Sequence, residues 1–405
     1  MNDQELDEWG ILALYSHGFD VQYKTLGRVG DSNIITDYEA YILGAVPLGR
    51  NVSDYAQKII AAQKKDGKFA DYIDGSGTDL INAHVWGILS LYVANQETYD
   101  KGKALKWLKE NQNEDGGFSV YTGDANSDLD MTAMAIVAYN ILGLDANSEE
   151  ITKALAFIQE NLDRKESCES VAWYILARKQ LGLEIDASLY NKLLAYQLQD
   201  GSFKHLKNLS RGNYIATWHG LLALSDYEAP VSIFTRLHNL NKFKDLKRND
   251  YAFKEIMELV NRKVVSGYPD GTFKPDAPVK RSEFAKFLVY GMKLQHLITG
   301  ETGAFTDLKG HWSNRIVNVA VQKKLMQGIG SGKFAPEEKI TGAQVATILV
   351  RAKGLESQAK SITGTNWYDG YVAVARQNGL LYQNFDPTKY ATRAQCAVVI
   401  AKLMK

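Results

Sequence analysis

A seven-residue motif, Q-x-x-D-G-x-F, recurs three times in the first half of this 405-residue chain and restricts its fold more than any other feature. The copies span residues 63–69, 112–118 and 197–203, so the first two start 49 residues apart and the last two 85 apart. Each copy follows an amphipathic stretch and precedes an apolar one rich in small residues, which is typical of helix, turn and helix. The pattern predicts an array of helix pairs with a period of about 40–50 residues.

The residue types of the motif predict structural roles. Glycine accepts a positive φ in the turn, aspartate bonds nearby backbone donors, and phenylalanine can pack back on the helix just finished. We therefore interpret the motif as a structural device and not as a catalytic signature.

Helix pairs joined by this motif resemble the α-α toroid shared by prenyltransferase β-subunits, squalene and terpene cyclases, and cobalamin carriers. The resemblance covers roughly residues 5–230 and concerns the fold alone, because this architecture hosts unrelated activities. Five clear helix pairs can be counted in the sequence, where six complete a ring.

A second repeat begins near residue 240. Residues 264–275 read VVSGYPDGTFKP and are followed by VKRSEFA at 279–285. This combination resembles the S-layer homology domain, and a second copy from residue 305 and a shorter third from 367 keep its register. The spacing from the aromatic to the signature position is 30 residues in copies one and two and 26 in copy three.

This resemblance implies a three-pronged unit with one helix of each copy in a central bundle and grooves between the prongs. The predicted fold is mainly all-α. The predicted domains are a toroid at 1–238 and S-layer homology repeats at 239–297, 298–357 and 358–405.

Proteins of the S-layer homology family bind the secondary polysaccharide of Gram-positive-type cell walls, commonly at a sugar that carries a pyruvate ketal. A ketal carboxylate favours a bidentate arginine, and a sugar ring favours an aromatic platform beside polar groups. The residues that match the family's positions are Asp245, Tyr251, Gly267, Arg281, Glu283, Asp307, Trp312, Gly328, Trp367 and Arg393.

The copies depart from the family pattern in two places. Gly342 stands where copy two should have its arginine, and copy three lacks the loop glycine and the aspartate. We expect one or two working grooves, with Arg281 the first carrier of glycan binding and Arg393 the next. The alternative is that these arginines only bridge helices.

The strongest sign of enzymatic chemistry lies in residues 128–133, DLDMTA, which resemble the D-x-D-D-T-A motif of squalene cyclases. Met131 replaces the last aspartate, and aspartates at a helix start commonly serve as caps. The residues predicted to line the toroid cavity are Asp128, Asp130, His84 and His219. For both histidines, a place in the packed core is the alternative.

No metal or other cofactor is predicted. Thr132 stands where a prenyltransferase would need a cysteine ligand for zinc, and Ile215 stands where it would need a histidine. Residues 124–130 space oxygen ligands as a calcium loop does, but Leu129 occupies the place of the required glycine.

Composition excludes several classes of partner. The formal net charge is zero, so nothing in it favours nucleic acid or an anionic membrane as a partner.

Cys168 and Cys396 form neither a CxxC pair nor a disulfide framework. No apolar run is long enough to span a bilayer, and residues 1–8 lack signal-peptide features. If the protein is exported, we expect that its signal has been removed from this sequence.

The sequence as a whole predicts an extracellular protein anchored to the cell wall, whose partner is wall polysaccharide and whose toroid is a non-catalytic display module. Two alternatives remain open for the toroid. It could be an enzyme acting on a polyprenyl-like substrate, or a receptor for a small molecule such as a cobalamin-like ligand.

Overall fold

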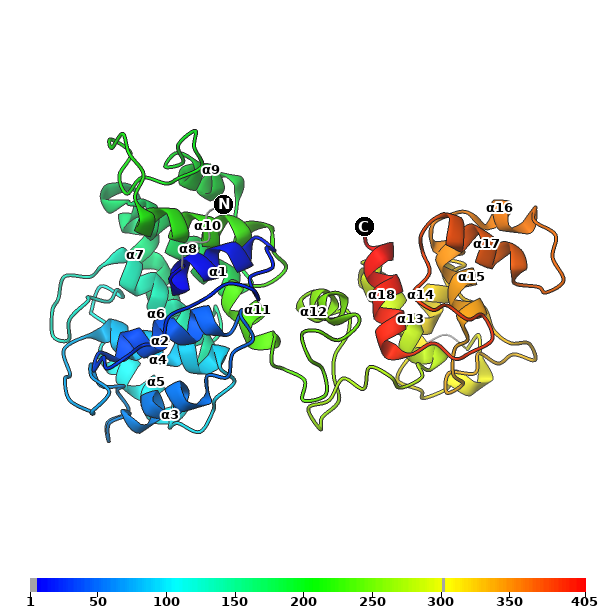
Figure 1. Cartoon of the computed structure of the whole chain (residues 1–405), viewed down its shortest axis with the longest axis horizontal. Coiled ribbons are helices and arrows are strands. Elements are labelled where there is room, and N and C mark those ends of the chain that lie inside the picture. Colours follow the sequence, from blue (N-terminus) through cyan, green and yellow to red (C-terminus); the bar gives the residue numbers. More distant parts are fainter. Residues whose placement is uncertain (1–5, 301–302) are drawn as a thin grey trace. The chain divides into compact units, whose positions relative to one another are not determined.

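The computed structural model describes residues 6–300 and 303–405, and it divides into two compact units after Lys242 (Figure 1). Residues 1–5 of the predicted toroid and 301–302 of the predicted second repeat lie outside the described ranges. The predicted boundary at 238/239 falls inside a helix of the first unit, four residues too early. No helix within the described ranges is long and apolar enough to cross a membrane.

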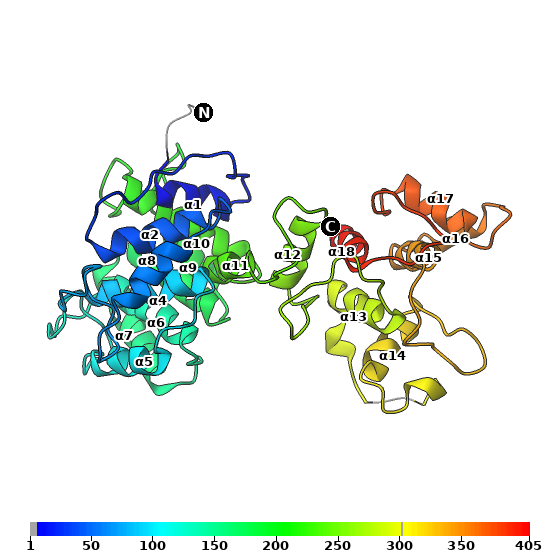
Figure 2. The same ribbon diagram turned by 60° about the horizontal axis from the view of Figure 1, so that its bottom comes forward.

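Six inner helices of the first unit form a closed ring, in which each helix contacts the next and the last contacts the first (Figure 2). They are α1 (Glu8–Ser16), α2 (Ile35–Ala45), α4 (Ile81–Val93), α6 (Leu129–Ile141), α8 (Cys168–Gln180) and α10 (Tyr214–Glu228). The N-terminal ends of neighbouring inner helices lie together, because the backbone N–H groups of Ile35, Ile81 and Cys168 at three helix starts each donate to the loop before the next inner helix. We call this end of the ring its mouth. The sequence did not show this closure, because α1 follows no copy of the turn motif.

The repeated motif builds the turns that precede three of the inner helices, α4, α6 and α10, as predicted. Gly67, Gly116 and Gly201 all have positive φ angles. The phenylalanine of each copy is fully buried. The glutamine side chain of the first copy, Gln63, donates to the carbonyl of Gly67 and ties the turn to the next outer helix through Asp100.

Outer helices pack against the ring, and a short helix crosses its C-terminal end. The outer helices are α3 (Ser53–Ala61), α5 (Lys101–Glu110), α7 (Glu149–Lys165) and α9 (Ala187–Leu194). The crossing helix α11 (Ile233–Asn239) contacts α4, α8 and α10. Arg236 donates to the carbonyl of Ser16 at the end of α1, and His238 accepts from Asn95 just beyond α4. Helix α11 therefore closes this end of the ring.

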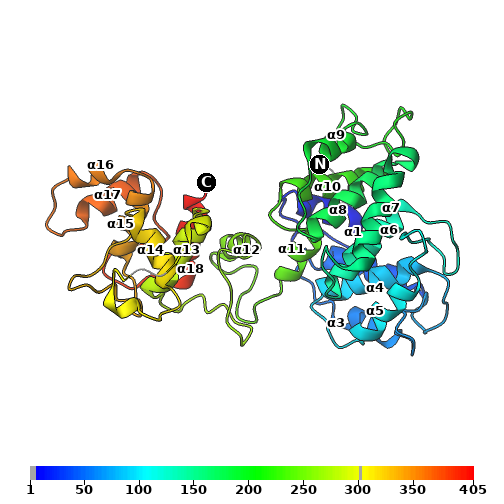
Figure 3. The same cartoon turned by 180° about the vertical axis from the view of Figure 1, so that it is seen from behind.

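The second unit contains three helix pairs, which run from yellow-green to red in Figure 3. They are α12 (Phe253–Asn261) with α13 (Arg281–Gly291), α14 (Asn314–Gln322) with α15 (Gly342–Ala352), and α17 (Asp369–Gln377) with α18 (Arg393–Leu403). Short turns of helix lie between them: η1 (Gln295–Leu297), η2 (Thr306–Leu308) and α16 (Glu356–Lys360).

The second helices of the three pairs form the centre, since α18 contacts both α13 and α15. Each first helix packs on the second helix of another pair: α12 on α18, α14 on α13, and α17 on α15. The segments before the central helices close a ring of backbone hydrogen bonds, from Val279 to Ala391, from Ala391 to Ile340 and from Ile340 to Val279. The repeats are thus interlocked, and the grooves lie between different repeats.

Candidate functional site

The starts of α13, α15 and α18 hold the equivalent residues Arg281, Gly342 and Arg393. Arg281 donates from Nε to the carbonyl of Phe334 (3.0 Å) and from Nη2 to that of Gln327 (2.7 Å). Its guanidinium lies 4.7 Å from the centre of the Phe334 ring. Because both carbonyls belong to the loop of the next repeat, Arg281 joins repeats one and two.

Arg393 makes the same contacts with the loop of repeat one. Its Nε donates to Phe273 (2.8 Å) and its Nη2 to Ser266 (2.9 Å). Both arginines are buried. Each therefore has a structural role through two of its nitrogens, which leaves Nη1 as the atom able to meet a ligand.

Gly342 has no room for a side chain. A Cβ at this position would lie 2.2 Å from the carbonyl oxygen of Asp386 and 2.9 Å from the hydroxyl of Tyr382. The shortened loop of repeat three thus occupies the space that an arginine fills elsewhere. The missing arginine of copy two and the altered loop of copy three therefore go together, because the loop lies where the arginine side chain would be.

Four of the residues predicted to contact glycan make contacts within the protein. Asp245 accepts from the backbone of Phe273 (2.7 Å) and Lys274 (2.8 Å), and Asp307 holds the equivalent loop in the same way. Cβ atoms on Gly267 and Gly328 would lie 2.3 and 2.5 Å from phenylalanine rings of their own repeats. These four residues therefore shape the loops, and the close approach at both glycines is made by a phenylalanine.

A groove of about 170 Å³ opens beside Arg281. Its lining comes from all three repeats: Arg281, Met326, Gln327, Gly328, Ile329, Gln344, Thr347, Ile348, Arg351 and Trp367. The Trp367 side chain is 64% exposed and offers a flat apolar surface. Arg351, which the family motif did not single out, is oriented by Glu356 (3.1 Å) and by the Gln327 side chain (3.3 Å).

The surroundings of Arg393 differ in charge. Glu283 lies 3.6 Å from Arg393 Nη1 while its other oxygen accepts from the backbone of Lys280. Beside Arg281, the equivalent position holds the neutral Gln344, which caps its helix through Thr341. The groove at Arg281 is therefore cationic, whereas the charge of Arg393 is already balanced.

The remaining predicted aromatics lie at equivalent places two residues before a helix. Trp312 precedes α14 and is exposed. Tyr251 precedes α12, and its hydroxyl accepts from the backbone of Gln383 in the loop of repeat three (3.2 Å). In that third groove, Lys402 donates to the carbonyls of Gly379 and Leu381.

A cluster of aromatic rings lies in the interior of the toroid. Trp9 stacks on Trp218 at 4.5 Å and lies 5.3 Å from Trp86, which lies 5.5 Å from Trp173. Phe234 of α11 stacks on Trp173 from the closed end. These rings occupy part of the space that the resemblance assigned to a cavity.

The two predicted cavity histidines are packed core residues. His84 accepts from the backbone of Phe69 (3.1 Å), contacts the Ala104 carbonyl on α5 and so points away from the ring interior. His219 bonds the carbonyl of Ile215 (2.9 Å). Burial lowers the pKa of His84 to about 3 and that of His219 to about 4, so both are neutral.

Asp128 and Asp130 lie at the mouth of the ring. Asp128 caps α6 by accepting from the backbone of Met131 (2.8 Å), as the capping interpretation predicted. Burial, with help from the nearby Asp128 and Glu169 carboxylates, raises the pKa of Asp130 to about 7 against the effect of a Ser170 hydrogen bond. The cyclase motif has a second aspartate directly after the one that Asp130 matches. In this chain the buried Met131 stands at that position.

Comparison with known families agrees with both resemblances. Residues 242–285 and 304–346 match the S-layer homology domain, and residues 52–168 match the N-terminal domain of squalene-hopene cyclases. The second unit therefore carries S-layer homology repeats, and the helical toroid fold of the first is confirmed.

Similar proteins share a limited stretch with the chain. A cellulosome-anchoring protein of Acetivibrio thermocellus is 29% identical over 38% of this chain and 33% of its own length. A surface-layer 125 kDa protein of Lysinibacillus sphaericus is 26% identical over 44% of this chain and 16% of its own length. An endoglucanase of a Bacillus species is 26% identical over 41% of this chain and 19% of its own length. The chain thus spans a third or less of these relatives.

Among solved structures, Candida albicans protein geranylgeranyltransferase-I is similar at 14% identity with a TM-score of 0.41, over 54% of this chain and 82% of that one.

Proposed function

We propose that the chain is a bacterial cell-surface protein whose second unit binds the secondary polysaccharide of a Gram-positive-type wall and thereby displays the toroid. The S-layer homology match and the cell-surface relatives support the surface location. The relatives include an endoglucanase, so an anchor of this kind can accompany a catalytic domain.

The groove beside Arg281 is the observation that carries the proposal. It combines two guanidinium groups, from Arg281 and Arg351, with the exposed ring of Trp367. A sugar ring can stack on the indole while a ketal carboxylate accepts from Nη1 of Arg281 and from the guanidinium of Arg351. We therefore propose that a pyruvylated sugar occupies this groove.

The other two grooves are poorer sites for an acidic sugar. Glu283 already pairs with Arg393, and a second carboxylate there would meet like charge. The groove at Gly342 has no arginine at the equivalent position, and the Lys402 ammonium already donates to two backbone carbonyls. One competent groove is the proposal that fits these contacts.

For the toroid, we propose a non-catalytic role. Its tryptophan cluster takes up interior space that a polyprenyl chain would need, and Asp130 lacks the neighbouring acid that the cyclase motif supplies. The packed interior argues against the enzymatic alternative and against a cobalamin-like ligand at the centre of the ring.

Co-sedimentation of the full chain with purified wall material tests the anchor. One sample keeps its ketals, a second has lost them by mild acid hydrolysis, and a third has lost the whole polysaccharide. We expect binding to the first sample, with affinity about tenfold lower or worse for the second, since one charge-assisted pair is worth about 1.5–3 kcal/mol. Equal binding to all three samples would overturn the proposal.

A further inference from the structure

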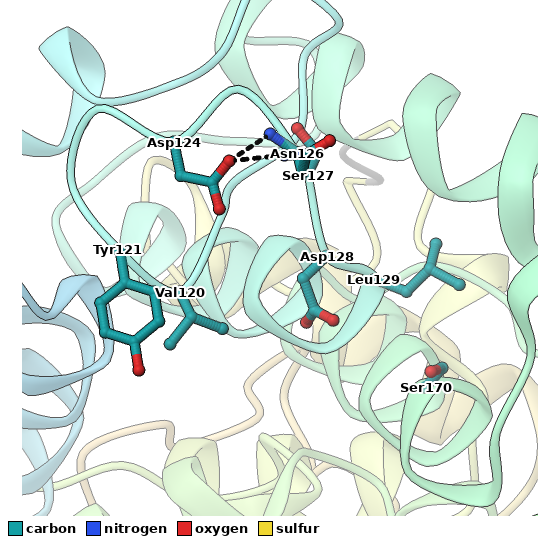
Figure 4. Close-up of a pocket in the computed structure, with 8 residues that line it drawn as sticks. All are labelled: Val120, Tyr121, Asp124, Asn126, Ser127, Asp128, Leu129 and Ser170. Atoms are coloured by element: carbon teal, nitrogen blue, oxygen red, sulfur yellow. Dashed lines mark hydrogen bonds between the residues drawn. The ribbon is translucent and has the colours of Figure 1, made fainter.

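A second concave site lies on the toroid, at the starts of α6 and α8 (Figure 4). It has a volume of about 300 Å³. We call it the rim pocket, and its lining is Val120, Tyr121, Asp124, Asn126, Ser127, Asp128, Leu129 and Ser170. None of these residues belongs to the tryptophan cluster inside the ring.

The rim pocket offers hydrogen-bond acceptors that the protein leaves unused. One oxygen of Asp128 accepts the hydrogen bond that caps α6. One oxygen of Asp124 accepts from both the backbone and the side chain of Asn126. Within the described residues, no hydrogen bond reaches the second oxygen of either carboxylate or the Tyr121 hydroxyl. In Figure 4 the Asp128 carboxyl points away from the 124–127 loop, to the side of the pocket on which Ser170 lies.

The charge of the rim pocket excludes anions. Hydrogen bonds from the backbone and side chain of Asn126 hold the pKa of Asp124 below its ordinary value, so this carboxylate is ionised at neutral pH. No lysine, arginine or histidine is among the lining residues. A ligand that fits must bring donors of its own, either hydroxyl or amine groups.

Exposed apolar side chains surround the mouth on which the rim pocket lies. Most of the large exposed hydrophobic residues of the first unit occur just before the inner helices or in their first turn: Ile34, Tyr72, Tyr121, Leu206, Leu209, Tyr214 and Ile215. The Tyr121 ring is 56% exposed and is held by pairing of its backbone with Leu80 of the preceding loop. A flat ring fixed in this way, beside free carboxylates, is a platform for a sugar.

We propose that the rim pocket binds a neutral sugar residue of a glycan. The C–H face of the ring stacks on Tyr121 and covers the apolar surface of Val120 and Leu129. Hydroxyl groups of the sugar donate to Asp124 and Asp128. An amine ligand would use the carboxylates but not this apolar surface, so a polyol fits the whole lining better.

The toroid would then carry its own specificity for glycan, independent of the anchor groove. This inference does not rest on the proposed wall anchoring, because no residue of the second unit takes part. A neutral sugar also separates the two sites chemically, since the groove at Arg281 selects for negative charge.

The test uses the full chain carrying Trp367→Ala, which weakens the anchor groove. Chitohexaose, cellohexaose and mannohexaose are titrated separately, with spermidine as a cationic probe, by saturation-transfer NMR and calorimetry. We expect one oligosaccharide to bind with a dissociation constant of about 1 mM or lower. Tyr121→Ala and Asp124→Asn should each weaken it by about fivefold or more.

Tyr23→Ala is the matched control, because Tyr23 is exposed and lies outside the rim pocket. It should leave binding unchanged, and circular dichroism should show native helicity for every variant. Saturation by none of the three oligosaccharides, binding of spermidine instead, or equal binding by Tyr121→Ala overturns the proposal.

Discussion

At the scale of single residues, Arg281 and Arg393 serve the fold and leave one nitrogen for function. Their sequence motif predicted the position of both, but not their partners, because the bonded carbonyls lie 46–127 residues away. What separates the two sites is one neighbour, Gln344 in one case and Glu283 in the other. Glutamine and glutamate both cap a helix, so the sequence shows the exchange but not that each residue faces the arginine of another repeat.

Gly342→Ala should destabilise the second unit. The added Cβ meets the Asp386 carbonyl at 2.2 Å, and crowding of this kind costs about 1–3 kcal/mol. Urea unfolding measures the loss of stability. Gly303→Ala serves as the control because nothing lies within 4 Å of its Cβ. If both variants unfold at the same urea concentration, the coupling of Gly342 to the loop of repeat three is wrong.

Asp130 gives a prediction about pH. Its folded pKa of about 7 exceeds the value of about 3.9 in an unfolded chain. The contribution of the protonated acid is therefore complete below about pH 4 and is lost as the pH rises through 7. Asp130→Asn should match the natural chain near pH 4 and exceed its stability by up to about 4 kcal/mol at pH 8, since the two pKa values differ by about 3 units.

Unfolding by urea at both pH values checks the Asp130 prediction. The control is Glu114→Gln, which removes an exposed carboxylate. A stability difference for Asp130→Asn that does not change between the two pH values would show that Asp130 titrates normally.

At the scale of helices, the turn motif predicted the helix pairs well but not the way the ring ends. The buried phenylalanines and positive-φ glycines of the motif explain the success. Helices α1 and α11 carry no copy of the motif, so neither the closure by α1 nor the crossing of α11 could be read from it. The sequence left open whether His84 lines the cavity or packs in the core, because an inner helix has a second buried face, toward α5, that looks the same in sequence.

Phe234→Ala tests the closure of the ring by α11. Phe234 is buried and stacks on Trp173, so its loss should cost about 3–5 kcal/mol and admit water to the closed end. Thermal unfolding and tryptophan fluorescence report the two effects. Phe19→Ala, which removes an exposed ring, should change neither. An unaltered melting temperature for Phe234→Ala contradicts the closing role of α11.

At the scale of the whole molecule, the chain combines two units that each have a core of their own. We expect two calorimetric transitions. Ligands stabilise only the unit that binds them, so wall polysaccharide at about 100 times its dissociation constant should add about 2.7 kcal/mol to one transition. Gly342→Ala identifies the transition of the second unit. A shift of the other transition by wall polysaccharide would place its binding site in the toroid.

The most direct test of the anchor is a matched exchange of charge between two grooves, measured by calorimetry with soluble pyruvylated wall polysaccharide. Gln344→Glu places beside Arg281 the carboxylate that Glu283 places beside Arg393, and Glu283→Gln does the reverse. Both exchanges keep the helix caps. We predict that Gln344→Glu lowers affinity by about tenfold or more, whereas Glu283→Gln keeps it or adds a second site. Unchanged affinity in Gln344→Glu, or a loss only in Glu283→Gln, would contradict binding at Arg281.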